Sequence, residues 1–364
     1  MDIKVFLRIS IGFLSLLFLN LPQMVWAQSE AQNLIKDLRQ IHTPNGIEVL
    51  EKVMLNGREQ WINIRGKDKS NPVLLVLHGG PASPLMPTSW AYQTPWEDFF
   101  TVVHWDQRGA GKNWTESDTV LLAEELSFRQ VIQDAYVLVD TLRDRFHQEK
   151  VFLMGYSYGA SIGIRMASRI PQKIYAYIGV GQTSPQNPEK LIFDRLLELT
   201  SQHQDTLAIQ ELNAIAPYPN LDGSTPLRKM MTVRKWARKY NGGWYGKPDM
   251  NLYFDLPKLS PEYSSQDFES LATSTSWITR KLFAKGPEAP FPYEFQIPVI
   301  FLMGKHDLHT PYSGAKSYWD SISSPNKQFV SFEYSGHMPF LEEQGKFLMT
   351  LVQEVLPFAQ HPEN

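Results

Sequence analysis

The sequence predicts an α/β fold in which a mostly parallel sheet is covered by helices on both faces and interrupted by an inserted segment. Strand-like and helix-like segments alternate along most of the 364 residues, as they do when strands are joined by crossover helices. The run 73–77 is apolar at every position, which is expected of a strand buried on both faces. These two observations carry the prediction.

The expected strands are short β-rich or apolar runs bounded by turn residues. Asn56-Gly57 lies between the first two and is a strong hairpin signal. In chain order, the strands are expected at 47–55, 60–65, 73–77, 100–105, 151–154, 174–180, 299–303 and 328–334.

Helices are expected between these strands. Apolar residues recur every three or four positions from Phe128 to Leu142, which is the spacing of an amphipathic helix. Small residues after Ser157 begin a second helix, a third follows Pro311, and the last spans about 341–355.

The regular alternation lapses between residues 183 and 296, which are rich in Pro, Gly, Trp and Tyr. We interpret this segment as an insertion between two strands of the sheet. It would then lie over the carboxyl ends of the strands, where open α/β sheets bind ligands. The core would comprise residues 28–182 and 297–364.

Residues 1–27 have the features of a secretory signal. Lys4 and Arg8 precede the apolar run 9–19, which is shorter than the roughly 20 residues of a membrane span. The sequence Val25-Trp26-Ala27 places small residues where a signal peptidase cleaves. We therefore expect a secreted or periplasmic protein with no stable membrane span after cleavage. An uncleaved N-terminal anchor is the alternative.

The composition limits which binding partners and which catalytic groups are expected. The formal net charge is −3 and no long block of one sign occurs, so a nucleic-acid partner is not expected. The chain has no cysteine, which excludes disulfides, thiolate metal sites and a cysteine nucleophile.

Residues 155–159 match the pattern G-x-S-x-G, directly after an expected strand and before an expected helix. That context is the one in which a nucleophilic serine is carried on a sharp, strained turn. The glycines are required because larger side chains would clash with the neighbouring strand and helix. Ser157 is therefore the candidate nucleophile.

A serine hydroxyl needs an adjacent base, and His337 is the candidate because it lies between an expected strand and the last helix. Asp307 lies between Ser157 and His337 in the sequence, directly after an expected strand. This reproduces the order Ser, acid, His in which such triads occur on α/β sheets. Asp255 and Asp267 are the alternatives for the acid, although neither follows a strand.

The loop after strand 73–77 contains His78-Gly79-Gly80-Pro81. We expect the backbone N–H groups of Gly80 and Tyr158 to form an oxyanion hole, with His78 bracing the loop. His306 and His309 flank Asp307 and raise the alternative of a metal site. We expect no metal or other cofactor, because no third ligand cluster is evident and serine chemistry needs none.

These motifs resemble the proline iminopeptidase branch of the α/β-hydrolases, which carries HGGPG and DQRGxGxS. Here the matching segments are His78-Gly-Gly-Pro-Ala-Ser-Pro84 and Trp105-Asp-Gln-Arg-Gly-Ala-Gly111, followed by the serine motif. The resemblance covers about residues 45–182 and 297–355. It implies an α/β-hydrolase core with a mostly helical cap at 183–296, the triad Ser157, Asp307 and His337, and release of an N-terminal residue, typically proline, from short peptides.

The sequence also departs from this family. Ala82 replaces the third loop glycine, Tyr158 replaces a tryptophan, and Lys112-Asn113 replaces Arg-Ser. Cap carboxylates hold the substrate's amino group in the family. The start of the cap here offers Glu189, Asp194 and Glu198, and Glu189 is the first choice because it lies where the chain leaves the core.

The sequence therefore favours a serine hydrolase that acts on a small peptide, amide or ester. Release of N-terminal residues is the first hypothesis. A carboxylesterase, lactonase or amidase acting on small hydrophobic substrates would use the same triad. A non-catalytic binding protein is a third possibility, which the complete triad disfavours.

Overall fold

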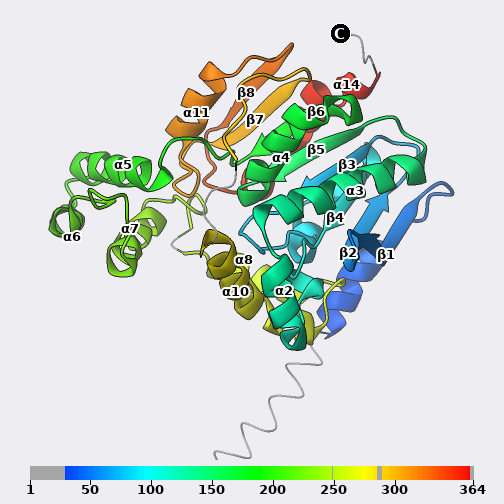
Figure 1. The fold of residues 1–364 in the computed structure, drawn as a ribbon, viewed down its shortest axis with the longest axis horizontal. Helices are drawn as coiled ribbons and strands as arrows, with labels where there is room; N and C mark the ends of the chain where they lie inside the picture. The colour runs from blue at the N-terminus through cyan, green and yellow to red at the C-terminus, as the bar shows by residue number, and fades with distance from the viewer. Residues whose placement is uncertain (1–28, 248, 285–288, 361–364) are drawn as a thin grey trace, which may run out of the picture.

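One eight-stranded sheet organises the chain (Figure 1). The computed structural model describes residues 29–247, 249–284 and 289–360, and the expected signal segment at 1–27 lies outside them. The strand order is β1-β2-β4-β3-β5-β6-β7-β8. Strand β2 pairs antiparallel with β1 and β4, and all other pairs are parallel. The predicted mostly parallel sheet is confirmed.

Each expected strand is present, with ends that match the expected ones or differ from them by at most two residues. The strands are β1 (Ile47–Leu55), β2 (Arg58–Gly66), β3 (Val73–Leu77), β4 (Thr101–Trp105), β5 (Val151–Tyr156), β6 (Ile174–Val180), β7 (Val299–Gly304) and β8 (Lys327–Phe332). The hairpin is confirmed at Asn56-Gly57, where both residues have positive φ angles of 46° and 79°.

Two hydrophobic cores lie on opposite faces of the sheet, and successive strand residues alternate between them. In β3, Leu75 and Leu77 belong to one core, whereas Leu74 and Val76 belong to the other. All five β3 residues are buried. Because both faces are covered, neither side of the strand is polar, and its sequence is a continuous apolar run.

Helices cover both faces. Helices α3 (Phe128–Phe146), α4 (Tyr158–Arg169) and α11 (Tyr312–Ser321) contribute buried residues to the first core, and α3 and α4 lie side by side across the sheet in Figure 1. The second core receives side chains from the 3₁₀ helices η1 (Met86–Ala91) and η2 (Thr94–Asp98) and from the C-terminal segment. Helix α2 (Thr119–Glu125) and a helix at residues 29–38 also lie outside the insertion.

The C-terminal segment is not the single helix that was expected at 341–355. It consists of α12 (Pro339–Glu342), α13 (Gln344–Thr350), a π-helical turn (Leu351–Val355) and α14 (Pro357–Gln360). The break falls at Glu343, whose φ and ψ of −124° and 57° are not helical. The carboxylate of Glu343 instead accepts hydrogen bonds from Tyr334 N and Ser335 Oγ at 2.9 and 2.7 Å.

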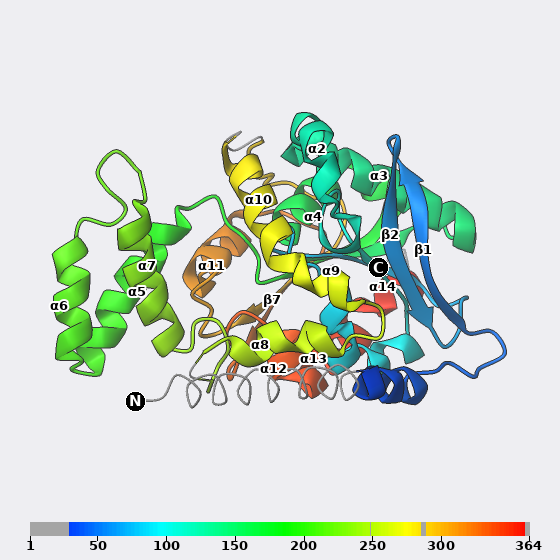
Figure 2. The same ribbon diagram turned by 90° about the horizontal axis from the view of Figure 1, so that it is seen from below.

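The inserted segment forms two groups of helices (Figure 2). Helices α5 (Pro188–Gln202), α6 (Thr206–Ile215) and α7 (Leu227–Lys239) pack around a small core of their own, which we call the outer lobe. Helices α8 (Asn251–Asp255), α9 (Ser265–Glu269) and α10 (Leu271–Ala284) form the second group. Ile278 and Leu282 of α10 are buried in the first core of the sheet, so this group is part of the main body.

A buried ion pair joins the hairpin, the loop after β4 and helix α3. Arg108 donates to both carboxylate oxygens of Asp134, at 2.7 and 2.9 Å, and both side chains are almost fully buried. Asn56 and Gln60 also donate to Asp134, each at 2.9 Å. Removing one partner of such a pair leaves the other charge buried and uncompensated.

We therefore expect Asp134→Ala to lower the free energy of unfolding by about 3 kcal/mol, as measured by urea denaturation. Asp320→Ala is the matched control, because Asp320 pairs with Lys316 on the surface with side chains 55% and 42% exposed. That control should cost less than about 1 kcal/mol. Equal losses in the two variants would contradict the importance assigned to the Arg108 pair.

Candidate active site

Ser157 occupies a strained turn between β5 and α4. Its φ and ψ are 54° and −115°, a left-handed conformation that non-glycine residues rarely adopt. A Cβ on Gly159 would lie 2.1 Å from Leu77 O, and one on Gly155 would lie 2.6 Å from Gly159 O. Only glycine fits at either position: Gly159 because α4 approaches β3, and Gly155 because the start of α4 lies against the end of β5.

The carboxylate of Asp307 and the imidazole of His337 are joined by a hydrogen bond of 2.8 Å between Oδ2 and Nδ1. Asp307 also accepts bonds from the N–H groups of His309 and Thr310, at 2.7 and 2.9 Å, and from Thr310 Oγ1 at 2.8 Å. With its acceptors engaged in this way, the carboxylate holds Nδ1–H of His337 as the donor. This leaves Nε2 as the acceptor nitrogen.

The sheet brings these segments together because their strands are neighbours. Ser157 follows β5, Gly181 follows β6, Asp307 follows β7 and His337 follows β8. The His337 ring lies against the ring of Tyr156, with centroids 4.9 Å apart, and a Cβ on Gly181 would lie 3.0 Å from its Cε1. Among the described residues, no hydrogen bond joins Ser157 Oγ to His337. Such bonds often form only when substrate is bound.

The inserted segment accepts backbone hydrogen bonds from two loops. We call them the acid loop, which follows β7 and contains Asp307, and the histidine loop, which follows β8 and contains His337. Gly243 O accepts from His337 N at 3.0 Å, and Gly242 O accepts from Leu308 N at 3.1 Å. The carboxylate of Glu342 accepts from Gly336 N and Met338 N, on either side of His337, each at 2.9 Å.

Glu342 also reaches the inserted segment itself, where it accepts from Tyr245 N at 2.5 Å. Burial raises the pKa of Glu342 above its usual value, although its three N–H donors oppose the shift. We call residues 241–245 the strap, because this one stretch contacts the acid loop, the histidine loop and Glu342.

The loop after β3 lies against the elbow. A Cβ on Gly79 would lie 3.0 Å from Ser157 Cβ, and Gly80 has a φ of 109°, where a side chain would be strained. Tyr158 is the first residue of α4, where backbone N–H groups point out of the helix N-terminus. Gly80 and Tyr158, the predicted oxyanion donors, are therefore on the two segments that border Ser157, and Gly79 is the closer glycine.

His78 braces this loop, as the sequence predicts. Gln107 N donates to His78 Nε2 at 3.1 Å, so the ring proton lies on Nδ1, which donates to Gly79 O at 2.9 Å. Burial lowers the pKa of His78 to about 4, which keeps the ring neutral at neutral pH. Both nitrogens are thus engaged in structural bonds.

At the positions that depart from the family pattern, the structure shows how each residue is accommodated. Ala82 keeps a left-handed φ of 57° where the family has glycine. Tyr158 packs edge-on against Phe128, with ring centroids 5.8 Å apart. Lys112 pairs with Asp267 of α9 at 2.7 Å and donates its N–H to Asp106, whose pKa is raised to about 7 by burial.

Glu189, the candidate for binding a substrate amine, has other partners. Its carboxylate pairs with Arg234 and accepts a hydrogen bond from Tyr218, both within the outer lobe. The guanidinium of Arg234 already neutralises the Glu189 carboxylate, which a substrate ammonium would need as its own partner. The structure therefore brings Asp307 and His337 together but leaves Glu189 engaged elsewhere.

His306 and His309, the pair considered for a metal, face different neighbours. His306 stacks on Tyr245 with centroids 4.5 Å apart, whereas His309 stacks on His337 at 4.9 Å. Within the part of the chain that the structure describes, no three His, Asp or Glu side chains cluster as a metal site would require.

Sequence reasoning missed Gly79, Thr310, the strap and Glu342. Thr310 and Glu342 follow Asp307 and His337 by three and five positions. Their roles depend on which backbone groups the loops present, and no local pattern in one sequence reports that.

The comparisons with known proteins agree with this geometry. The model of the alpha/beta hydrolase fold family matches residues 72–344. The probable aminopeptidase YbaC of Bacillus subtilis is 27% identical over 314 residues, which cover 84% of this chain and 95% of that protein. The proline iminopeptidase of Lactobacillus helveticus is 24% identical over 330 residues, covering 87% of this chain and all of the relative.

A solved structure shows the same fold. The proline iminopeptidase of Mycobacterium smegmatis superposes with a TM-score of 0.56 at 17% identity, over 86% of this chain and 98% of that one. Because the family match spans well over half of the sequence, the chain belongs to the α/β-hydrolase fold family and is a hydrolase of the serine type, similar to the proline iminopeptidases.

Proposed function

We propose that this protein is a secreted or periplasmic serine hydrolase that releases N-terminal residues, proline or similar, from short peptides or amides. The observation that carries the proposal is the 2.8 Å hydrogen bond between Asp307 and His337, formed beside the strained turn of Ser157. The relatives named as an aminopeptidase and as proline iminopeptidases support the class of substrate.

In this mechanism, Ser157 Oγ attacks the acyl carbonyl carbon while His337 Nε2 accepts its proton. The oxyanion receives hydrogen bonds from the backbone N–H groups of Tyr158 and Gly80. His337 then gives the proton to the leaving amine, the carbon–nitrogen bond breaks, and an acyl-enzyme remains on Ser157. A water molecule, deprotonated by His337, hydrolyses the ester and frees the serine.

A carboxylesterase, lactonase or amidase remains the second candidate, because the same steps cleave esters. One observation favours it. Glu189 is already paired with Arg234 and therefore does not offer a free carboxylate to a substrate amine.

Glu342 is a positioning residue in this scheme. It holds the N–H groups before and after His337 and also the N–H of Tyr245 in the strap. A carboxylate can accept all three bonds, whereas an amide has one acceptor oxygen and would turn its NH₂ group toward at least one of them. The position of His337 should therefore depend on the charge of Glu342.

The proposed function is tested with a panel of chromogenic prolyl, alanyl and other aminoacyl amides beside short-chain acyl esters. We expect the aminoacyl amides to have the higher kcat/KM. Ser157→Ala should lower turnover by at least about a thousandfold without changing the circular dichroism spectrum, because the nucleophile is lost and the fold is kept.

A fluorophosphonate probe serves as the control for the nucleophile and should label Ser157 alone. Full activity in Ser157→Ala would rule out the assignment. If the wild type preferred simple esters, the esterase hypothesis would be favoured over the peptidase hypothesis.

For Glu342→Gln, we expect kcat to fall about ten- to a hundredfold with KM within about twofold of wild type, because a displaced base slows chemistry more than binding. The pH profile is the decisive measurement. Glu342 must be ionised to accept its bonds and its pKa is raised, so its protonation adds to the loss of wild-type activity as pH falls. The acid limb of the variant should be shallower.

Glu333→Gln is the matched control, because Glu333 is exposed and pairs only loosely with Lys305 at 3.5 Å. Its kinetics should be those of wild type. If Glu342→Gln lost unfolding free energy while its acid limb kept the wild-type slope, Glu342 would be a support of the fold and no more.

The signal at residues 1–27 predicts a mature protein that begins at Gln28. N-terminal sequencing of protein recovered from the periplasm or medium of the expressing cells should find that terminus. Recovery of the full-length chain in the membrane fraction would favour the uncleaved anchor instead.

A further inference from the structure

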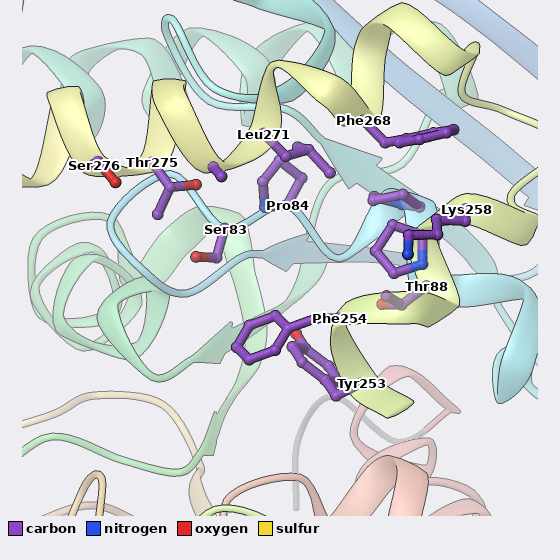
Figure 3. Close-up of a pocket in the computed structure, with 13 residues that line it drawn as sticks. Ser83, Pro84, Thr88, Tyr253, Phe254, Lys258, Phe268, Leu271, Thr275 and Ser276 are labelled. Atoms are coloured by element: carbon purple, nitrogen blue, oxygen red, sulfur yellow. The ribbon is translucent and has the colours of Figure 1, made fainter. Parts of the chain in front are cut away.

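A pocket of about 390 Å³ opens beside the loop that carries Gly79 and Gly80. Ser83 and Pro84 of that loop form one wall. Figure 3 shows Leu271, Thr275 and Ser276 of α10 on one side of it, and Tyr253 and Phe254 on the other. The volume is within the range of sites that hold small ligands.

The pocket is joined to the elbow through short contacts. Ser83 N donates to Gly79 O at 3.1 Å, and Gly79 borders the Cβ of Ser157. On the opposite wall, Thr275 Oγ1 donates to Ala82 O at 2.6 Å. A substrate carbonyl bound at Ser157 would therefore have this pocket next to it.

The lining is mostly apolar and offers little to a charged group, although it also includes the hydroxyl-bearing residues Ser83, Thr88, Tyr253, Thr275 and Ser276. It includes Phe254, Phe268 and Leu271 together with three prolines, and no described carboxylate lines it. Its one ionisable nitrogen, Lys258 Nζ, pairs with Asp255 at 2.6 Å. Phe254 is 65% exposed and lines the pocket, so its ring offers an apolar surface to a ligand bound there.

The chemistry decides which part of the substrate lies here. The leaving group must be within reach of His337, because His337 protonates it. The acyl part then extends away from His337, toward the loop after β3. The pocket is lined by residues of that loop and by none from the segments 307–310 or 335–338.

We propose that this pocket binds an apolar, uncharged substituent on the acyl part of the substrate, and that it selects substrates by the size of that group. The inference rests on the proposed serine mechanism and specifies its acyl group. It holds for an apolar N-terminal side chain and for a simple acyl chain alike, because both would place hydrocarbon in the same site.

The test uses p-nitrophenyl esters of straight-chain acids from acetate to heptanoate, which need no amine-binding group. Each methylene buried in the pocket should raise kcat/KM by up to about fourfold until the pocket is filled. The 6-aminohexanoyl ester matches the heptanoyl ester in length but ends in an ammonium group. It should react at least about tenfold more slowly than heptanoate, because the pocket cannot solvate the charge.

Ala272→Trp should fill the pocket, since Ala272 is an exposed residue of α10 that lines it. The ratio of heptanoate to acetate kcat/KM should fall at least tenfold. Thr273→Trp is the control, because Thr273 is exposed on the same helix and is not a lining residue, so it should keep the wild-type ratio. Phe254→Ser, at a position already largely exposed, should lower the ratio severalfold even if the tryptophan variant misfolds.

The two proposals fail in different ways. If the wild type hydrolyses these esters without a preference for length, or if Ala272→Trp and Phe254→Ser both keep the wild-type preference, the pocket does not bind the acyl group. If no ester turns over and the fluorophosphonate probe does not label Ser157, the proposed function fails and this inference fails with it.

Discussion

The parallel pairing of β3, β5, β6, β7 and β8 is the constraint on which the rest of the structure depends. Parallel strands end at the same edge, so the loops after β5, β7 and β8 are forced into one region although they are separated by 150 residues from Ser157 to Asp307 and 30 more to His337. The glycines of the elbow follow from the same constraint. Gly159 is needed because α4 approaches β3 closely at that edge, and Gly155 because the start of α4 lies against the end of β5.

The inserted segment does more than cover this edge. Its strap accepts hydrogen bonds from Leu308 N and His337 N, and Glu342 ties the strap to the loop of His337. The acid and histidine loops therefore have part of their backbone hydrogen bonds satisfied by residues that come from between β6 and β7. The outer lobe of α5–α7, by contrast, packs around its own small core, to which Leu308 of the main body also contributes.

Much of this arrangement could be predicted because it is encoded in short-range patterns. Apolar runs such as 73–77 identify buried strands, and G-x-S-x-G after a strand identifies the elbow without knowledge of any partner. The order Ser157, Asp307, His337 follows from the positions of strands in the sequence. Such features need only local spacing and the rule that strand ends meet.

What could not be predicted depends on partners that are distant in sequence. The pairing of Glu189 with Arg234 requires α5 and α7 to pack together, and no periodicity in either helix specifies that. The helix break at Glu343 arises because its carboxylate bonds Tyr334 N and Ser335 Oγ. The division of residues 183–296 into an outer lobe and a part packed on the main body depends on Ile278 and Leu282 reaching the core of the sheet.

The left-handed backbone at Ala82 affects how this enzyme could be engineered. An alanine at φ of 57° costs about 1 kcal/mol relative to glycine, so its loop is not held in shape by its own backbone preference. It is held by its neighbours, among them Thr275 of α10, whose hydroxyl donates to Ala82 O. The shape of the loop after β3 therefore depends in part on α10: a chimera with another cap would lose the Thr275 hydrogen bond to Ala82, and a glycine at position 82 would relieve the strain that this bond now helps to offset.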